Sequence, residues 1–329
     1  MGIFLYIILI ILGALYVTKP KKQLFYFYFI VIIIFIITIR IYPKGVDFVE
    51  YYRYLHYFTF DFRHIREFVY FFISFNIFNV INNEIITFIL LDVIWVLILF
   101  KIQQQLHLEF NSKNHIFFVI IFTSFPLFFG YENIYRQLFA EIFSLYAYSI
   151  RTQSINKSNL FFILAIFSHN TALVILPLLM IRKNFNFSIK IRVLTSTGLS
   201  IIYILLFEIA SQYKSGHETG LNMGIFYLLI FTILVYIFII KNNFNIITFI
   251  DKFPSLYIGL ILILSLVLLP IGNMVVERIG MFFLIFVIYD LYAYSFNITN
   301  KYKQVLFRLN LLLLFSLPVI LFQSSRNML

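Results

Sequence analysis

Apolar residues run in long blocks along the whole chain, and short polar or charged connections separate these blocks. A helix needs about 20 mostly apolar residues to cross the hydrocarbon part of a bilayer. The pattern therefore predicts an all-α polytopic integral membrane protein with about ten full transmembrane helices. These helices are expected near residues 2–18, 23–42, 84–101, 114–130, 134–150, 193–210, 222–240, 255–272, 279–297 and 304–321.

Two apolar segments do not fit this alternation. Residues 158–181 are interrupted by Ser168-His169-Asn170, which predicts a short out-and-back helical hairpin with His169 at its turn. Residues 66–81 are rich in aromatic side chains and predict an amphipathic or re-entrant segment at the outer face. Irregular backbone at membrane depth is tolerated only where it is buried in protein or lines a cavity. Both segments are therefore candidates for function.

Composition excludes a soluble fold. Hydrophobic residues make up 62% of the 329 positions and charged residues 12%, whereas about a quarter of a soluble domain is charged. No soluble fold can bury that much apolar surface, and the polar connections are too short to form a separate soluble domain. We therefore expect a single transmembrane domain over residues 1–329, with extracytoplasmic loops at 43–66 and 211–222.

Basic residues predict the orientation, because cytoplasmic connections carry an excess of Lys and Arg. Lys19, Lys21 and Lys22 place the first connection inside, and both termini then lie outside. On this topology nine of the 25 basic residues lie outside, and seven of these nine are Arg. The planar guanidinium suits bidentate contacts with phosphate, so an anion site is predicted at the outer face. A chance fluctuation combined with snorkelling Arg side chains is the alternative.

The first polar constellation lies where the second predicted span ends. Arg40 is followed by a Pro and a Gly that end the helix, and then by Asp47 and Tyr51. Aromatic faces beside acids and cations at the outer boundary are the groups that a sugar ring needs. The alternative interpretation is an interfacial belt of aromatic residues with local salt bridges.

The second constellation opens the span predicted at 134–150. Glu132 and Arg136 are four residues apart, with the acid on the N-terminal side, so they are expected to share one face of a helix. Tyr135 lies beside them. An Arg in the first turns of a span usually faces protein or a wet cavity and is a candidate functional residue. A structural Glu132–Arg136 ion pair is the alternative.

The third and fourth constellations contain His169 and Arg278. His is the side chain best suited to exchange a proton near neutral pH, although the polar residues around His169 are also suited to capping two short helices. Arg278 enters the membrane from the same side as Arg136 on the predicted topology. Two cations at one depth repel each other unless an anion lies between them. A diphosphate fits that requirement, and nearby carboxylates are the alternative counter-charge.

Several other kinds of site have no sequence signal. The chain has no Cys, no Asp-x-Asp motif, no paired His and no glycine-rich phosphate loop. Metal and nucleotide-sugar sites are therefore not predicted. We expect no cofactor and no nucleic-acid partner.

The order of four short motifs resembles that of the EpsG family of Wzy-like polysaccharide polymerases, over roughly residues 1–300. The motifs are Arg40, Gly45, Asp47 and Tyr51; Arg136-Gln-Leu-Phe-Ala140; Phe167-Ser-His169-Asn-Thr-Ala172; and Arg278-Ile-Gly-Met-Phe-Phe283. Each motif is weak alone, and their order relative to the spans makes the resemblance specific.

The resemblance implies a metal-independent glycosyltransferase of the bacterial inner or plasma membrane, with a multi-pass fold and an extracytoplasmic active site. It would transfer a glycan from undecaprenyl diphosphate to the nonreducing end of another lipid-linked repeat unit, in assembly of an O-antigen, capsule or exopolysaccharide. The lipid bilayer, a chain-length regulator and a flippase are the implied partners.

Residue roles follow from that reaction. Arg136 and Arg278, together with Arg40, are expected to bind the diphosphate, and His169 or Asp47 is expected to accept the proton of the acceptor hydroxyl. The candidate sugar contacts are Tyr51, Glu132 and Tyr135.

Two other classes of protein share these features. A flippase or transporter for lipid-linked oligosaccharides is also polytopic and basic, but usually has internal symmetry, and the sequence shows no internal repeat. A membrane acyltransferase or ligase acting on surface glycans also uses Arg and His, but an acyltransferase would take its acyl donor from the cytoplasmic side.

Overall fold

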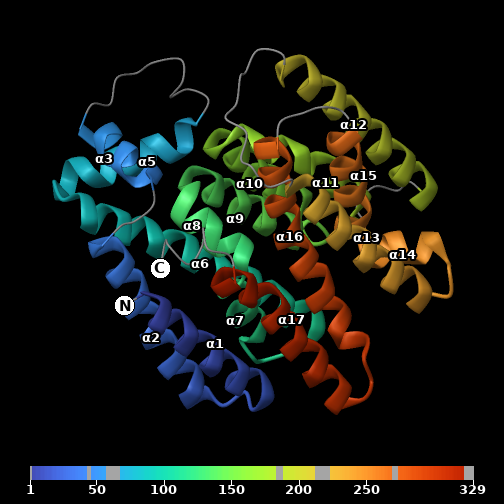
Figure 1. The fold of residues 1–329 in the computed structure, drawn as a ribbon, viewed down its shortest axis with the longest axis horizontal. Coiled ribbons are helices and arrows are strands. Elements are labelled where there is room, and N and C mark those ends of the chain that lie inside the picture. The colour runs from blue at the N-terminus through green and yellow to red at the C-terminus, as the bar shows by residue number, and fades with distance from the viewer. Residues whose placement is uncertain are drawn as a thin grey trace. The chain divides into compact units, whose positions relative to one another are not determined.

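Figure 1 shows the chain in a computed structural model, which describes residues 2–42, 46–56, 67–182, 188–211, 223–268 and 273–321. All regular structure in these ranges is helical, as predicted. The helices divide between two compact units, one containing 1–149, 159–170 and 292–329 and the other containing 150–158 and 171–291. We describe each unit separately.

The first unit contains the N-terminal helices and the C-terminal helix. Its main elements are α1 (Gly2–Thr18), α2 (Lys22–Ile41), α3 (Val46–His56), α5 (Phe68–Ile81), α6 (Glu84–Phe110), α7 (Ile116–Phe122), α8 (Phe125–Asn133), α9 (Tyr135–Ile150), most of α10 (Ile155–Ser168), η2 (Ser295–Asn297) and α17 (Lys301–Leu321). Helix α1 packs between α2 and α17, and α6 packs against α2 and α5.

Helix α7 is at the core of this unit. All seven of its side chains are buried, as expected for a helix that is apolar on every face. The helix ends because the hydroxyls of Thr123 and Ser124 bind the carbonyls of its last turn, and Ser124 then adopts an extended backbone. The span predicted at 114–130 is therefore two helices, α7 and α8, with a break between them.

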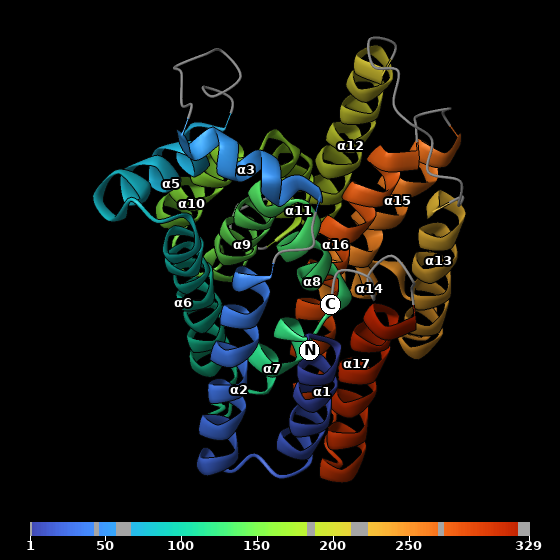
Figure 2. The same cartoon turned by 60° about the vertical axis from the view of Figure 1, so that its left-hand side comes forward.

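Helices α3 and α5 lie across one end of α2 and α6, as Figure 2 shows. Residues 68–81 form the helix expected within the aromatic segment, whereas part of the predicted loop 43–66 is the helix α3. Helix α5 ends at Asn82, whose φ of 51° is left-handed. The Asn83 side chain then caps α6 by accepting a hydrogen bond from the Ile86 amide at 3.0 Å. These two Asn residues produce the sharp turn that sets α5 across α6.

The second unit contains α11 (Leu176–Ile181), α12 (Ile189–Ser211), α13 (Met223–Lys241), α14 (Ile246–Lys252), α15 (Pro254–Leu268) and most of α16 (Asn273–Tyr294). Helix α15 packs against α11, α12, α13 and α14, and it bends by 100° from α14. The buried Asp290 of α16 accepts hydrogen bonds from the amide and hydroxyl of Ser255 at the start of α15. Gly280 of α16 lets the ring of Tyr227 in α13 approach closely, since a Cβ there would lie 2.7 Å from ring atoms.

Five of the described helices are long and apolar enough to cross a membrane, and a sixth span results if α14 and α15 count as one. Four shorter apolar helices, at 2–18, 68–81, 155–168 and 170–181, accompany them. Most helix boundaries agree with the predicted blocks to within four residues. The exceptions are α6, which continues nine residues beyond its predicted end, α16, which begins six residues before its predicted start, and the block 114–130, which is divided between α7 and α8. The membrane character is therefore confirmed, while the total of ten spans stays a prediction. Loop 211–222 falls almost entirely outside the described residues.

Candidate functional site

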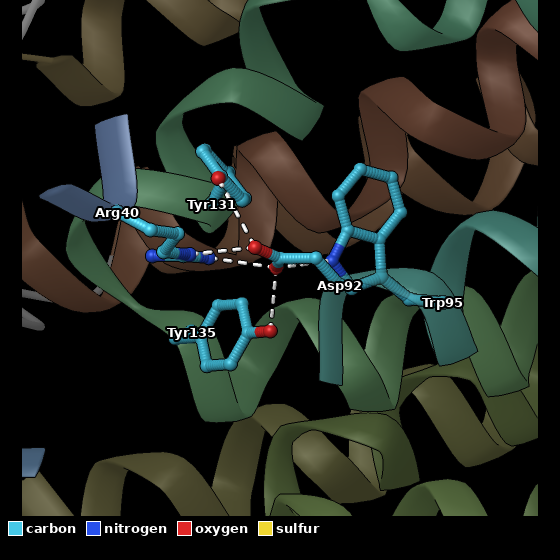
Figure 3. Close-up of polar contacts among 5 residues, drawn as sticks. All are labelled: Arg40, Asp92, Trp95, Tyr131 and Tyr135. Atoms are coloured by element: carbon cyan, nitrogen blue, oxygen red, sulfur yellow. Dashed lines mark hydrogen bonds and ion pairs between the residues drawn. The ribbon is translucent and has the colours of Figure 1, made fainter. Parts of the chain in front are cut away.

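A buried carboxylate connects four helices of the first unit. Asp92, in the middle of α6, has no solvent exposure and accepts hydrogen bonds from five donor atoms. Arg40 at the end of α2 donates from Nε at 2.6 Å and Nη2 at 2.7 Å. Trp95 donates at 2.8 Å, Tyr135 of α9 at 2.6 Å and Tyr131 of α8 at 3.2 Å. Figure 3 shows these four side chains pointing toward the carboxylate.

Aromatic rings surround the Arg40 guanidinium. Its central carbon lies 4.0 Å from the ring centroid of Tyr131, 4.7 Å from that of Tyr135 and 5.7 Å from that of Phe88. Arg40 has no exposed surface. Taking a guanidinium and a carboxylate out of water is costly, and bidentate contact with additional hydrogen bonds is what offsets that cost. The network therefore holds the C-terminal end of α2 against α6, α8 and α9.

The same network fixes the break between α8 and α9. Tyr131 and Tyr135, which precede and follow Ile134 in sequence, bind the same carboxylate. Ile134 itself has a φ of −133° and a ψ of 58°, which are not helical values. The expectation that Glu132 and Arg136 share one helix face is wrong, because this break separates them. Arg136 instead lies in the first turn of α9 and pairs with a residue at the start of another helix.

That partner is Glu67, the residue before α5. Its Oε2 accepts a hydrogen bond from Arg136 Nη1, and its Oε1 lies 3.5 Å from His169 Nε2. Glu67 caps no backbone amide of α5 with its side chain, so the carboxylate is directed at the cation and the imidazole. The Arg136 side chain is 31% exposed, while those of Glu67 and His169 are 13% and 14% exposed. This arrangement is a partly accessible cluster of one acid, one imidazole and one guanidinium.

Tyrosine and phenylalanine rings line the side of this cluster. Arg136 lies 5.5 Å from the ring of Tyr51 in α3 and 5.8 Å from the ring of Phe71 in α5. Tyr51 in turn contacts the rings of Tyr70 and Tyr135. A small hollow beside these rings is lined by Tyr51, Tyr54, Leu55, Tyr70, Phe71, Ser74 and Phe75. Aromatic faces with a few polar atoms are suited to stacking against a sugar ring.

His169 lies at the interruption that the sequence predicts. Helix α10 ends at Ser168 and a 3₁₀ helix, η1 (Asn170–Ile175), follows it, so His169 is between two helical segments. Its amide donates the last hydrogen bond of α10, to the Ala165 carbonyl. At this position the imidazole Nε2 lies 3.5 Å from Glu67 Oε1.

Five of the eight predicted site residues belong to this continuous set of contacts in the first unit: Arg40, Tyr51, Tyr135, Arg136 and His169. Arg278 is half-buried in α16, in the second unit. The side chains of Asp47 and Glu132 lie outside the part of the chain that the structure describes.

Sequence reasoning missed two residues of this set, Asp92 and Glu67. A signal existed for Asp92, because a lone carboxylate in the middle of a long apolar block usually has a partner and a role. For Glu67 the sequence held no such signal, since it stands in a polar connection beside an aromatic helix. Its importance appears only in the tertiary structure, where the start of α5 contacts the start of α9.

The cluster has the chemistry to bind an anion and to accept a proton. Arg136 occupies the first turn of α9, where the helix dipole also favours negative charge. His169, supported by a carboxylate, is suited to accept a proton. Within the described residues, no three His, Cys, Asp or Glu side chains gather as a possible metal site, and metal-independent catalysis stays a prediction.

Comparison with known proteins identifies one family. The family model described as "EpsG family" matches residues 23–328, which is most of the chain. No curated protein and no solved structure matches the chain. The predicted resemblance is confirmed by the family match: this chain belongs to the EpsG family, a family of Wzy-like polysaccharide polymerases.

Proposed function

We propose that this protein polymerises a bacterial surface polysaccharide by transferring the growing glycan from undecaprenyl diphosphate to the nonreducing sugar of another lipid-linked repeat unit. The proposal places the reaction on the outer face of the inner or plasma membrane. A flippase would supply the units, and a chain-length regulator would act on the product. Family membership supports the polymerase class, and the Arg136–Glu67–His169 cluster is the observation that carries the chemistry.

The donor's leaving group explains the need for cations. Breaking the bond from the anomeric carbon to the diphosphate leaves negative charge on the phosphate oxygen, and fixed guanidinium groups stabilise that charge as it develops. Arg136 is suited to this role because it is partly exposed and lies at the positive end of α9. Arg278 is the second cation of the proposal, contributed by α16.

Arg40 takes a different part in the proposal. Both its Nε and its Nη2 bind the buried Asp92, and its side chain has no exposed surface. These contacts favour a positioning role, in which Arg40 holds α2, α8 and α9 together, over direct contact with diphosphate.

The acceptor's attack requires a base. The acceptor hydroxyl oxygen attacks the anomeric carbon, its proton passes to His169, and the diphosphate departs with the electron pair of the broken bond. Direct displacement of this kind inverts the anomeric configuration. Asp47 is the alternative base, while Tyr51, Tyr135 and Glu132 are the proposed sugar contacts. General-base catalysis contributes about 10²–10⁴-fold to a rate, so loss of the base should reduce turnover strongly.

The test is polymer length in cells that lack the chromosomal gene and carry a plasmid copy. Arg136→Ala, Arg278→Ala and His169→Ala are each expected to accumulate single lipid-linked repeat units at the outer face, while wild type forms long chains. Arg53→Ala is the matched control, because Arg53 is exposed on α3 and lies outside the cluster. Membrane levels of each variant are measured by immunoblot.

Other outcomes would contradict the proposal. Wild-type polymer from both Arg136→Ala and Arg278→Ala at normal protein levels would refute the diphosphate assignment. Units trapped on the cytoplasmic side in the deletion strain would indicate a flippase. Full-length polymer that lacks a substituent would indicate an acyltransferase.

A further inference from the structure

Glu67 is shared between the two groups that the proposed reaction uses. Its Oε2 is bound by Arg136, and its Oε1 lies 3.5 Å from His169 Nε2, a distance at the upper limit for a hydrogen bond. The carboxylate therefore binds Arg136 closely and His169 only loosely. The two partners come from different segments, α9 and the α10–η1 break, so neither partner's position is set by its neighbours in sequence.

We propose that Glu67 is a positioning residue that couples binding of the donor diphosphate to activation of His169. In the absence of donor, the Glu67 carboxylate occupies Arg136. An arriving diphosphate competes for the same guanidinium, and its negative charge repels the carboxylate. Glu67 then moves fully onto His169 Nε2. This inference rests on the proposed function.

The consequence for His169 follows from the tautomer that a carboxylate selects. With Glu67 accepting from Nε2–H, the lone pair of His169 is on Nδ1, where it can take the proton of the acceptor hydroxyl. The imidazolium formed is stabilised by the same carboxylate, as the orienting acid does in hydrolytic triads. The base is thus fully oriented only after the donor has bound, which couples proton transfer to the presence of both substrates.

The pH dependence of the pair depends on the groups that face it. Among the described residues these groups include Arg136 from α9, Tyr51 from α3 and Tyr70 from α5. Glu67 is the carboxylate that faces His169, and a nearby carboxylate favours the protonated imidazole. Because the base must be neutral to act, the rate rises with pH through the titration of His169. Removing Glu67 should therefore move the acid limb, which is the rise in rate on the low-pH side of the rate–pH profile, to lower pH.

The test uses full-length protein in lipid nanodiscs, with lipid-linked repeat units extracted from the deletion strain. Glu67→Gln keeps the size of the side chain but removes its charge. We expect kcat to fall about 10- to 100-fold, consistent with partial loss of general-base catalysis. The KM for the donor should stay unchanged or fall, because the competitor for Arg136 is gone. The acid limb should move to lower pH, and Glu67→Asp should restore part of kcat.

Glu84→Gln is the matched control, because Glu84, at the start of α6, also pairs with a histidine, which is His56 of α3 and not His169. It should leave kcat, KM and the pH profile unchanged. The position of the acid limb does not depend on the amount of folded enzyme, so it remains readable in Glu67→Gln even if only part of that variant folds.

Three results would overturn the inference. One is a raised donor KM with unchanged kcat, which would make Glu67 a binding residue. Another is a loss of kcat with an unmoved acid limb, which would make its role structural. The third is wild-type kinetics in Glu67→Gln. Failure of wild type itself to extend the lipid-linked units would instead refute the proposed function.

Discussion

Removing the Asp92 carboxylate should destabilise the first unit more than loss of any other single polar group in the network. In Asp92→Ala the Arg40 guanidinium stays buried without its counter-charge, and three further donors lose their acceptor. Breaking a buried ion pair by removing one partner typically costs about 3–5 kcal/mol. We expect a loss of that size in the free energy of unfolding. The double variant Arg40→Met/Asp92→Leu should be more stable than Asp92→Ala, because no buried charge remains.

The assay is equilibrium unfolding by SDS in mixed micelles. Trp95 is the single tryptophan of the chain and is itself bonded to Asp92, so its fluorescence reports on this network, with circular dichroism as the global measure. A loss below about 1 kcal/mol in Asp92→Ala, the range typical of an exposed ion pair, would refute the account of a buried ion pair. Additive effects of the two single substitutions would refute it as well, since contacting residues should be coupled.

Further predictions concern hydrogen bonds and close packing. Tyr135→Phe should lower the free energy of unfolding by about 1.5–3 kcal/mol, which is the typical contribution of a hydrogen bond to a charged group. Tyr131→Phe should lower the free energy of unfolding by less, because the hydrogen bond from Tyr131 to the same carboxylate is 3.2 Å long and that from Tyr135 is 2.6 Å. Equal losses for the two variants in the SDS titration would contradict this ranking. Gly280→Ala should destabilise the second unit by about 1–3 kcal/mol through overpacking, since its Cβ would lie 2.7 Å from an aromatic ring of α13. Gly198→Ala is the control, because no atom lies within 4 Å of the new Cβ. It should leave the free energy of unfolding unchanged or raise it by up to about 1 kcal/mol. Equal losses at both glycines in a thermal melt would disprove the packing argument.

The sequence by itself determined the helices and most of their ends. Apolar blocks long enough for the bilayer have one stable backbone conformation in lipid, because every amide must be satisfied within its own segment. Local signals were equally informative at His169, where polar residues interrupt an apolar block and the structure has a break between α10 and η1. The order of short motifs was sufficient to indicate the family.

Local patterns failed where tertiary contacts compete with helix propensity. The segment 131–137 holds no Pro or Gly that would end a helix, yet Ile134 is not helical, and Tyr131 and Tyr135 on either side of it bind one buried carboxylate. The prediction that Glu132 and Arg136 lie on one face failed for this reason. Helical spacing predicts which residues share a face only while the helix is continuous.

Only the tertiary structure decided which charges meet. Arg40 and Asp92 are 52 residues apart, and Arg136 and Glu67 are 69 residues apart. Nothing in either residue's local sequence selects its partner, because the pairing depends on how α2 packs against α6 and how the start of α5 contacts the start of α9. Both Arg residues looked alike in the sequence, as cations at the ends of apolar blocks. Packing buried one of them against Asp92 and left the other partly exposed beside His169, and that difference in surroundings separates a structural cation from a candidate for binding substrate.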